Sequence, residues 1–312
     1  MDLVFCGTPQ FAVPTLEKLA ASGFRVRLVV TQPDRPRGRG QKSAASPVKV
    51  SAQALGLSVI EPETIKVNDA LRAQLESLKP AAIVIVGYGR IVPPWMLALA
   101  PLGNLNLHAS LLPKYRGAAP IQWAIANGEP ATGVTTMRIN EGLDTGDILL
   151  QKEIAIAPED TAVTLAPRLA AIGADLMLET LRGLEAGSLQ PRPQDHSRAT
   201  LAPLLKKEDG RIDFARRAQE IANRLRGFQP WPGAFATFRS KQLSVTAATP
   251  AASAASALAP GALAVEGERL LAGCGGATAL ELLELQPEGR KRMPARDFLH
   301  GYHPRSGERL GE

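Results

Sequence analysis

The sequence contains few of the residues that mark several common classes of protein. Only two cysteines, Cys6 and Cys274, occur in 312 residues, too few and too far apart for a disulfide framework or a zinc site. No run of about 18 apolar residues is present, which argues against a membrane-spanning helix. The first residues, MDLVFCGTPQF, lack the basic and long apolar segments of a secretion signal. We therefore expect a cytoplasmic protein.

Motifs of nucleotide, hydrolase and metal sites are also missing. The segment FCGTPQF has neither the GxGxxG pattern nor the lysine of a phosphate-binding loop, and no GxSxG motif occurs. None of the four histidines has a partner at a convincing metal-ligand spacing: His108, His196, His300 and His303. We expect no metal ion and no permanently bound cofactor.

Aromatic residues make up only 4% of the chain, so a core must rely on the other apolar side chains within the apolar share of 45%. In the first half, short apolar runs alternate with amphipathic stretches. We expect a helix over residues 11–22 and strands over residues 2–6, 25–31, 81–87 and 104–110. This β-α-β pattern predicts an α/β fold, a parallel sheet with helices on both faces. Ligands of such sheets bind outside the carboxyl ends of the strands.

The second half begins with helical periodicity over residues 161–187, where Pro167 indicates either a kink or a later helix start. The proline-rich, polar residues 191–210 read as a linker. After it we expect a helix over residues 213–226 and short strands in a small barrel or sandwich, with residues 247–263 as a surface loop. We predict a domain over residues 1–189, a linker over residues 190–206 and a second domain over residues 207–312.

Basic charge is gathered in two places. Of the net charge of +6, residues 31–49 carry +4 and residues 206–312 another +4, so the remainder is slightly acidic. A polyanion such as nucleic acid would explain this distribution, and an ordinary solvated surface is the alternative.

Polar residues end the apolar run at residues 104–110. Asn106 and His108 are two apart on a strand, so they face the same way, and both can stabilise an oxyanion. Asp144 and Asp147 lie in a glycine-rich turn that could supply a carboxylate, and a carboxylate beside His108 favours the charged imidazole. The alternative is a histidine and an asparagine satisfied by backbone groups, with Asp144 as a turn former.

Two motifs resemble the folate-dependent formyltransferases: N-x-H-x-S-L-L-P-x-Y-R-G-A-A-P at residues 106–120 and D-T-G-D at residues 144–147. The segments FCGTPQFA, TQPDRPRGRGQK, SLLPKYRGAAPIQWAI and NRLRGFQPWPGAF are similar to the members that act on tRNA. The resemblance spans nearly the whole chain. It implies a Rossmann-like formyltransferase domain followed by an OB-like β-barrel that binds tRNA.

The resemblance also implies a reaction for translation initiation, in which a formyl group passes from 10-formyltetrahydrofolate to the amine of initiator methionyl-tRNA. Asn106 and His108 would polarise the formyl oxygen, while Asp144 would hold and charge His108. The implied folate-binding residues are Ser110, Leu111, Leu112, Pro113, Tyr88, Arg90 and Ile91. Arg39 and Lys42 would bind the tRNA.

Two other readings stay open. A formyltransferase with a small amine substrate, or a hydrolase of the formyl-folate, would share the catalytic residues but would not need two basic segments. A non-catalytic RNA-binding module would not need Asn106, His108 and Asp144. We expect a monomer without a metal ion.

Overall fold

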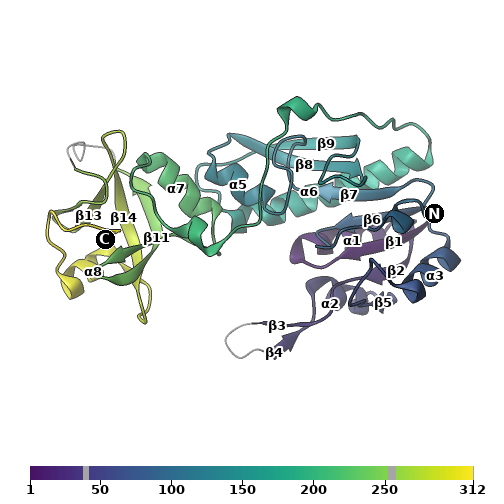
Figure 1. Cartoon of the computed structure of the whole chain (residues 1–312), viewed down its shortest axis with the longest axis horizontal. Coiled ribbons are helices and arrows are strands. Elements are labelled where there is room, and N and C mark those ends of the chain that lie inside the picture. The colour runs from purple at the N-terminus through teal and green to yellow at the C-terminus, as the bar shows by residue number, and fades with distance from the viewer. Residues whose placement is uncertain (38–41, 252–257, 312) are drawn as a thin grey trace. The chain divides into compact units, whose positions relative to one another are not determined.

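The computed structural model describes residues 1–37, 42–251 and 258–311. The chain divides into two compact units (Figure 1). The first unit comprises Met1–Pro120, Thr132–Ile154 and Ala166–Ala202, and the second comprises Ile121–Ala131, Ala155–Leu165 and Pro203–Glu312. The domain boundaries expected from the sequence stay a prediction.

A twisted sheet with the strand order β5-β2-β1-β6-β7-β8-β9 organises the first unit. Its strands are β1 (Asp2–Gly7), β2 (Arg25–Val30), β5 (Val59–Ile60), β6 (Ala82–Val86), β7 (Asn104–His108), β8 (Ala131–Arg138) and β9 (Ile148–Ala155). The strands from β5 to β7 are parallel, which confirms the α/β expectation. β8 runs antiparallel to β7, so the sheet is mixed where the sequence predicted parallel strands. The loop of residues 139–147 therefore joins two neighbouring strands, β8 and β9.

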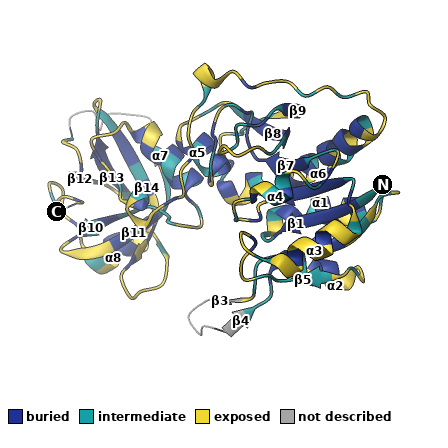
Figure 2. Ribbon diagram, turned by 45° about the vertical axis from the view of Figure 1, so that its right-hand side comes forward, coloured by how far each residue is buried: buried dark blue, intermediate teal, exposed yellow. Residues whose placement is uncertain are grey.

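Helices cover the sheet so that its central strands are buried, as the dark blue of β1 shows in Figure 2. They are α1 (Val13–Ala20), α2 (Pro47–Ala54), α3 (Asp69–Leu78), α4 (Pro94–Leu97) and α6 (Ala162–Glu185). Short 3-10 helices span Gln10–Ala12, His196–Arg198 and Lys207–Gly210, and a β3–β4 hairpin pairs Arg35–Arg37 with Lys42–Ala44. Residues of α3 and α4 share one apolar core with alternate residues of β1, β2 and β6.

The second unit contains all but the first residue of α5 (Pro120–Ala126), together with α7 (Ala218–Gly227) and α8 (Ala295–Tyr302). It also contains an antiparallel sheet ordered β10-β11-β14-β13-β12, with β15 beside β14. Its strands are β10 (Phe235–Phe238), β11 (Lys241–Pro250), β12 (Leu263–Glu266), β13 (Arg269–Cys274), β14 (Thr278–Pro287) and β15 (Met293–Pro294). The chain end bonds to both outer strands, because Leu263 of β12 donates to Glu308 O at 2.7 Å and Gly311 donates to Thr237 O of β10 at 2.8 Å. This arrangement is consistent with the small barrel that the sequence predicts.

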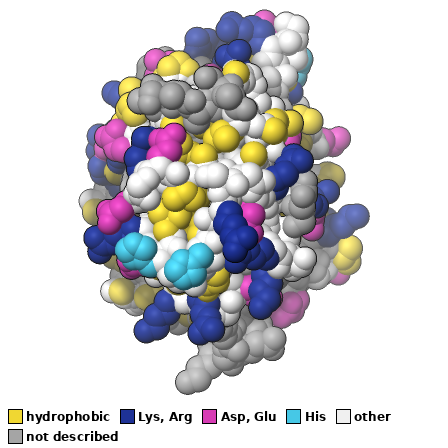
Figure 3. Space-filling view, turned by 90° about the vertical axis from the view of Figure 1, so that its left-hand side faces the viewer, with side chains coloured by type: hydrophobic (Ala, Val, Ile, Leu, Met, Phe, Trp, Pro, Cys, Tyr) yellow, Lys and Arg dark blue, Asp and Glu magenta, His cyan; other side chains and the backbone are white. Residues whose placement is uncertain are grey.

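Cations of the second unit are interspersed with acids. In Figure 3, which faces the left-hand side of Figure 1, Lys and Arg side chains are spread among acidic ones. Ion pairs explain part of this pattern: Arg239 bonds Glu308 and Arg269 bonds Glu281 at 2.9 and 2.7 Å. The net positive charge of this unit therefore does not form one bare patch on the face shown.

The start of one helix differs from the sequence-based expectation, and a proline lies inside another helix. α7 begins at Ala218 instead of residue 213, because Asp213 starts a turn in which its carboxylate accepts the Ala215 N–H at 3.0 Å. Pro167 lies inside α6. Because proline has no N–H, the carbonyl of Val163 receives no helical hydrogen bond. Val163 is 52% exposed, so water can bond to this carbonyl instead. No helix in the described part of the chain is long and apolar enough to cross a membrane.

Candidate active site

Asn104, Asn106 and His108 share one face of β7, because alternate residues of a strand point to the same side. α4 accepts hydrogen bonds from the first of them: Asn104 Nδ2 donates to Met96 O at 2.9 Å and to Leu97 O at 3.2 Å. The other two follow toward the carboxyl end of the strand, where Asn106 is partly exposed. The strand thus presents an amide and an imidazole at the edge where sheets of this kind bind ligands.

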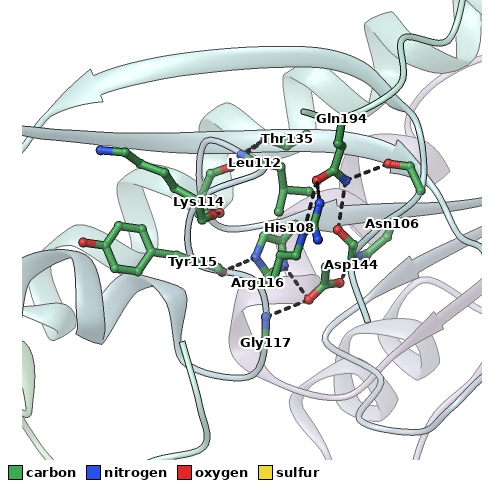
Figure 4. A network of polar contacts seen from close by, with 12 residues as sticks. Asn106, His108, Leu112, Lys114, Tyr115, Arg116, Gly117, Thr135, Asp144 and Gln194 are labelled. Atoms are coloured by element: carbon green, nitrogen blue, oxygen red, sulfur yellow. Dashed lines mark hydrogen bonds and ion pairs between the residues drawn. The ribbon is translucent and has the colours of Figure 1, made fainter. Parts of the chain in front are cut away.

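Asp144, on the loop between β8 and β9, faces this pair (Figure 4). Its Oδ2 accepts the Gly117 N–H at 2.8 Å and lies 3.7 Å from His108 Nδ1. Its Oδ1 lies 3.5 Å from Asn106 Nδ2. The structure therefore brings together the three side chains that the sequence singled out. The two longer contacts are of a kind that often tightens when a substrate binds.

The Nε2 side of the His108 ring is held by a backbone carbonyl, and the expected role of Asp144 on the Nδ1 side stays a prediction. Its Nε2 lies 2.8 Å from Tyr115 O, and a carbonyl can only accept, so this nitrogen carries a hydrogen. Its Nδ1 faces the Asp144 carboxylate beyond hydrogen-bond distance. Only the doubly protonated ring offers a donor to both acceptors. The Nδ1 side of this ring and the Asn106 amide both face the Asp144 carboxylate, and two such groups can donate hydrogen bonds to an oxyanion when the ring is doubly protonated.

The segment 110–113 is fastened by hydrogen bonds to β8 and β9. Ser110 is fully buried, and its hydroxyl donates to Lys114 O at 2.6 Å. The Thr135 hydroxyl donates to Ser110 O at 2.6 Å and accepts the Leu112 N–H at 3.2 Å. The Gln151 amide donates to Leu112 O at 2.9 Å. These contacts hold the segment 110–113 in place after His108. Folate binding by Ser110, Leu111, Leu112 and Pro113 stays a prediction.

The other three residues expected to bind folate, Tyr88, Arg90 and Ile91, have different environments. Tyr88 is 2% exposed, and its hydroxyl has no hydrogen-bond partner among the described residues. Burial raises the pKa of this phenol above its usual value. The Tyr88 carbonyl is held by the Gln32 side-chain amide at 2.7 Å. Ile91 is 90% exposed and Arg90 partly exposed, so these two are the more accessible to a ligand.

The two residues expected to bind tRNA cannot be placed with the others. Arg39 lies outside the described residues, and Lys42 begins β4 with its side chain outside them as well. Their role stays a prediction.

Gln194 is a buried polar residue that the sequence reasoning missed. Its side-chain amide donates to Asp144 O at 2.9 Å. The residue lies in the segment predicted as a linker, and no local pattern distinguishes it, because its partners are distant in the sequence.

The chain matches the family model described as formyl transferase over residues 1–181 and the model of its C-terminal domain over residues 204–303. It is 64% identical over 311 residues to a methionyl-tRNA formyltransferase of Koribacter versatilis, covering all of this chain and 99% of that protein. The chain belongs to the methionyl-tRNA formyltransferase family. A family member from Geobacter metallireducens is 46% identical, again over all of this chain and 99% of that protein.

Two solved structures of other formyltransferases share the fold of this chain. A sugar 3N-formyltransferase described in the presence of dTDP and 5-N-formyl-THF has a TM-score of 0.66 at 17% identity, covering 93% of this chain and 99% of that one. An N-formyltransferase from Helicobacter canadensis, in complex with folinic acid and dTDP-3-aminofucose, has the same TM-score at 20% identity, covering 91% of this chain and 98% of that one.

Proposed function

We propose that this protein transfers the formyl group of 10-formyltetrahydrofolate to the α-amine of initiator methionyl-tRNA. The observation that carries the proposal is the meeting of Asn106, His108 and Asp144 at the carboxyl end of β7. The proposal is supported by full-length similarity to methionyl-tRNA formyltransferases.

The site residues have defined roles in this reaction. The formyl oxygen binds beside Asn106 Nδ2 and His108 Nδ1, where the two donors increase the positive charge on the formyl carbon. The neutral amine attacks that carbon, a C–N bond forms, and the two donors stabilise the oxyanion. Asp144 accepts the amine proton, directly or through a water. The bond between the formyl carbon and N10 of the folate breaks, and N10 takes up the proton that Asp144 accepted, directly or through a water, so that the carboxylate is restored.

Substrate binding follows from the elements around this centre. The fixed 110–113 segment and residues 87–93 bound the folate, while Arg39 and Lys42 in the basic segment 31–49 contact the tRNA acceptor stem. The second unit binds the body of the tRNA. In this proposal the protein acts in the cytoplasm as a monomer, and the reaction needs no metal ion.

The test is an assay of the purified protein with methionyl-tRNA and 10-formyltetrahydrofolate, followed by chromatography of the amino acid released from the tRNA. We expect N-formylmethionine, and no formylation of free methionine. Formate release without tRNA would indicate a hydrolase, and formylation of a small amine would indicate a different acceptor. Binding of tRNA without formyl transfer would indicate an RNA-binding module.

A further inference from the structure

Gln194 connects two loops of the candidate active site (Figure 4). Its side chain is 6% exposed, and its Nε2 donates to Asp144 O at 2.9 Å and to Gly146 O at 2.7 Å. Its Oε1 accepts from Arg116 Nε at 3.2 Å and from Arg116 Nη2 at 2.7 Å. One amide therefore joins the loop that carries Asp144 to the segment that follows β7.

The chemistry of these contacts fits a neutral amide. Backbone carbonyls only accept and a guanidinium only donates, so the site requires two donors on one side and an acceptor on the other. Arg116 is itself 7% exposed and also donates to His196 Nδ1 at 3.0 Å. A buried guanidinium is costly unless it is hydrogen-bonded, and Gln194 supplies the acceptor on the side of the active site.

The Asp144 loop has a backbone that needs such support. Asp144 has a φ of 49°, in the left-handed region that few residues other than glycine adopt. Gly146 is so close to the chain that a Cβ there would collide with Arg138 O. Strained conformations persist when the surroundings hold them in place. Gln194 holds the Asp144 carbonyl, while the Gly117 N–H holds its carboxylate at 2.8 Å.

We propose that Gln194 is a positioning residue for formyl transfer: it fixes the Asp144 loop against the Arg116 segment so that the carboxylate faces His108 and Asn106. This inference rests on the proposed function, because its kinetic test measures formyl transfer to methionyl-tRNA. Gln194 contacts no reacting atom and acts through Asp144.

The first experiment compares Gln194→Leu with Gln190→Leu, a control at an exposed residue of the same segment. We expect Gln194→Leu to lower kcat about 10- to 100-fold, because a small displacement of a catalytic group is costly. The KM values for folate and methionyl-tRNA should change little, and Gln190→Leu should behave as the wild type. In an Asp144→Asn background, Gln194→Leu should cause little further loss, because residues that act through one another are not additive.

An equal loss of kcat in both backgrounds, or an unchanged kcat, would overturn the proposal. Hydrogen exchange supplies a readout independent of activity: amides of residues 142–147 should exchange faster in Gln194→Leu, and unchanged exchange there would also contradict it. If Gln194→Leu does not fold, Gln194→Glu carries the same expectations, because it keeps acceptors for Arg116 but places an oxygen against two carbonyls. An inactive wild-type protein would refute the proposed function alone, and the exchange comparison would still decide the role of Gln194.

Discussion

Gly173 of α6 lies directly against Leu107 of β7. A Cβ at position 173 would be 2.6 Å from Leu107 Cδ2 and 3.0 Å from Cδ1, closer than real Cβ contacts. Leu107 stands between Asn106 and His108 and points to the opposite face of the strand. α6 therefore packs tightly against the back of the strand that carries two candidate catalytic residues.

Gly173→Ala should lower the free energy of unfolding by about 1–2 kcal/mol, because overpacking a dense core costs more than the gain in helix propensity. Gly301→Ala in α8 is the matched control, since a Cβ there meets nothing within 4 Å. The control should be neutral or stabilising by up to about 1 kcal/mol. Urea unfolding of both variants measures the difference, and equal effects would show that the contact with Leu107 is not restrictive.

Removal of the His108 imidazole or of the Asp144 carboxylate should abolish most of the turnover. We expect His108→Ala and Asp144→Asn each to lower kcat about 100- to 1,000-fold, because both groups act on charge that develops during the reaction. Glu141→Gln, at an exposed residue of the same loop, should leave kcat unchanged. Thermal melts should show folded variants. A large fall in melting temperature with turnover near that of the wild type would indicate a structural role instead.

The sequence predicts the parts of the fold that local patterns specify. The continuous apolar run at residues 81–87 becomes the fully buried β6, and the alternation at residues 104–110 becomes β7 with its polar residues on one face. The antiparallel direction of β8 could not be predicted, because it depends on pairing across the sheet. The hydrogen bond between His108 and Tyr115 depends on how the chain turns after β7. Gln194 was missed for the same reason: its amide meets Asp144 only after folding.

Both thiols should be unreactive in the folded protein. Burial raises the pKa of the Cys274 thiol to about 11 and that of the Cys6 thiol further above its usual value. At pH 8 neither forms the reactive thiolate. Ellman's reagent should detect no thiol in buffer and two in denaturant, and rapid reaction in buffer would contradict this burial.

The raised pKa of the Cys274 thiol also predicts how the stability of the folded protein depends on pH. The folded state keeps the Cys274 proton more tightly than the unfolded state does, so the stabilisation is complete below the unfolded pKa of about 8.5. It should be lost progressively as the pH rises toward 11. Urea unfolding at pH 8 and pH 10 measures the loss, and Cys274→Ala should reduce it.

A substitution of Arg39 tests whether the acceptor of the formyl group is a tRNA. It belongs to the basic segment 31–49, and an arginine fork can bind a phosphate or a base edge through two hydrogen bonds. Arg39→Leu should raise the KM for methionyl-tRNA about tenfold at low salt, as expected for one lost contact to nucleic acid. The KM for 10-formyltetrahydrofolate should not change, because the folate binds at the strand ends.

Salt distinguishes this role from a general effect of charge. Part of the wild-type affinity comes from counterions released on binding, so the difference between Arg39→Leu and the wild type should shrink as the salt concentration rises. Lys66→Leu, which removes an exposed cation elsewhere in the first unit, should leave both KM values unchanged. Steady-state kinetics at two salt concentrations, with tRNA and folate varied separately, measure these effects. Equal changes for tRNA and folate would show that Arg39 acts on the folded enzyme as a whole and not on the tRNA.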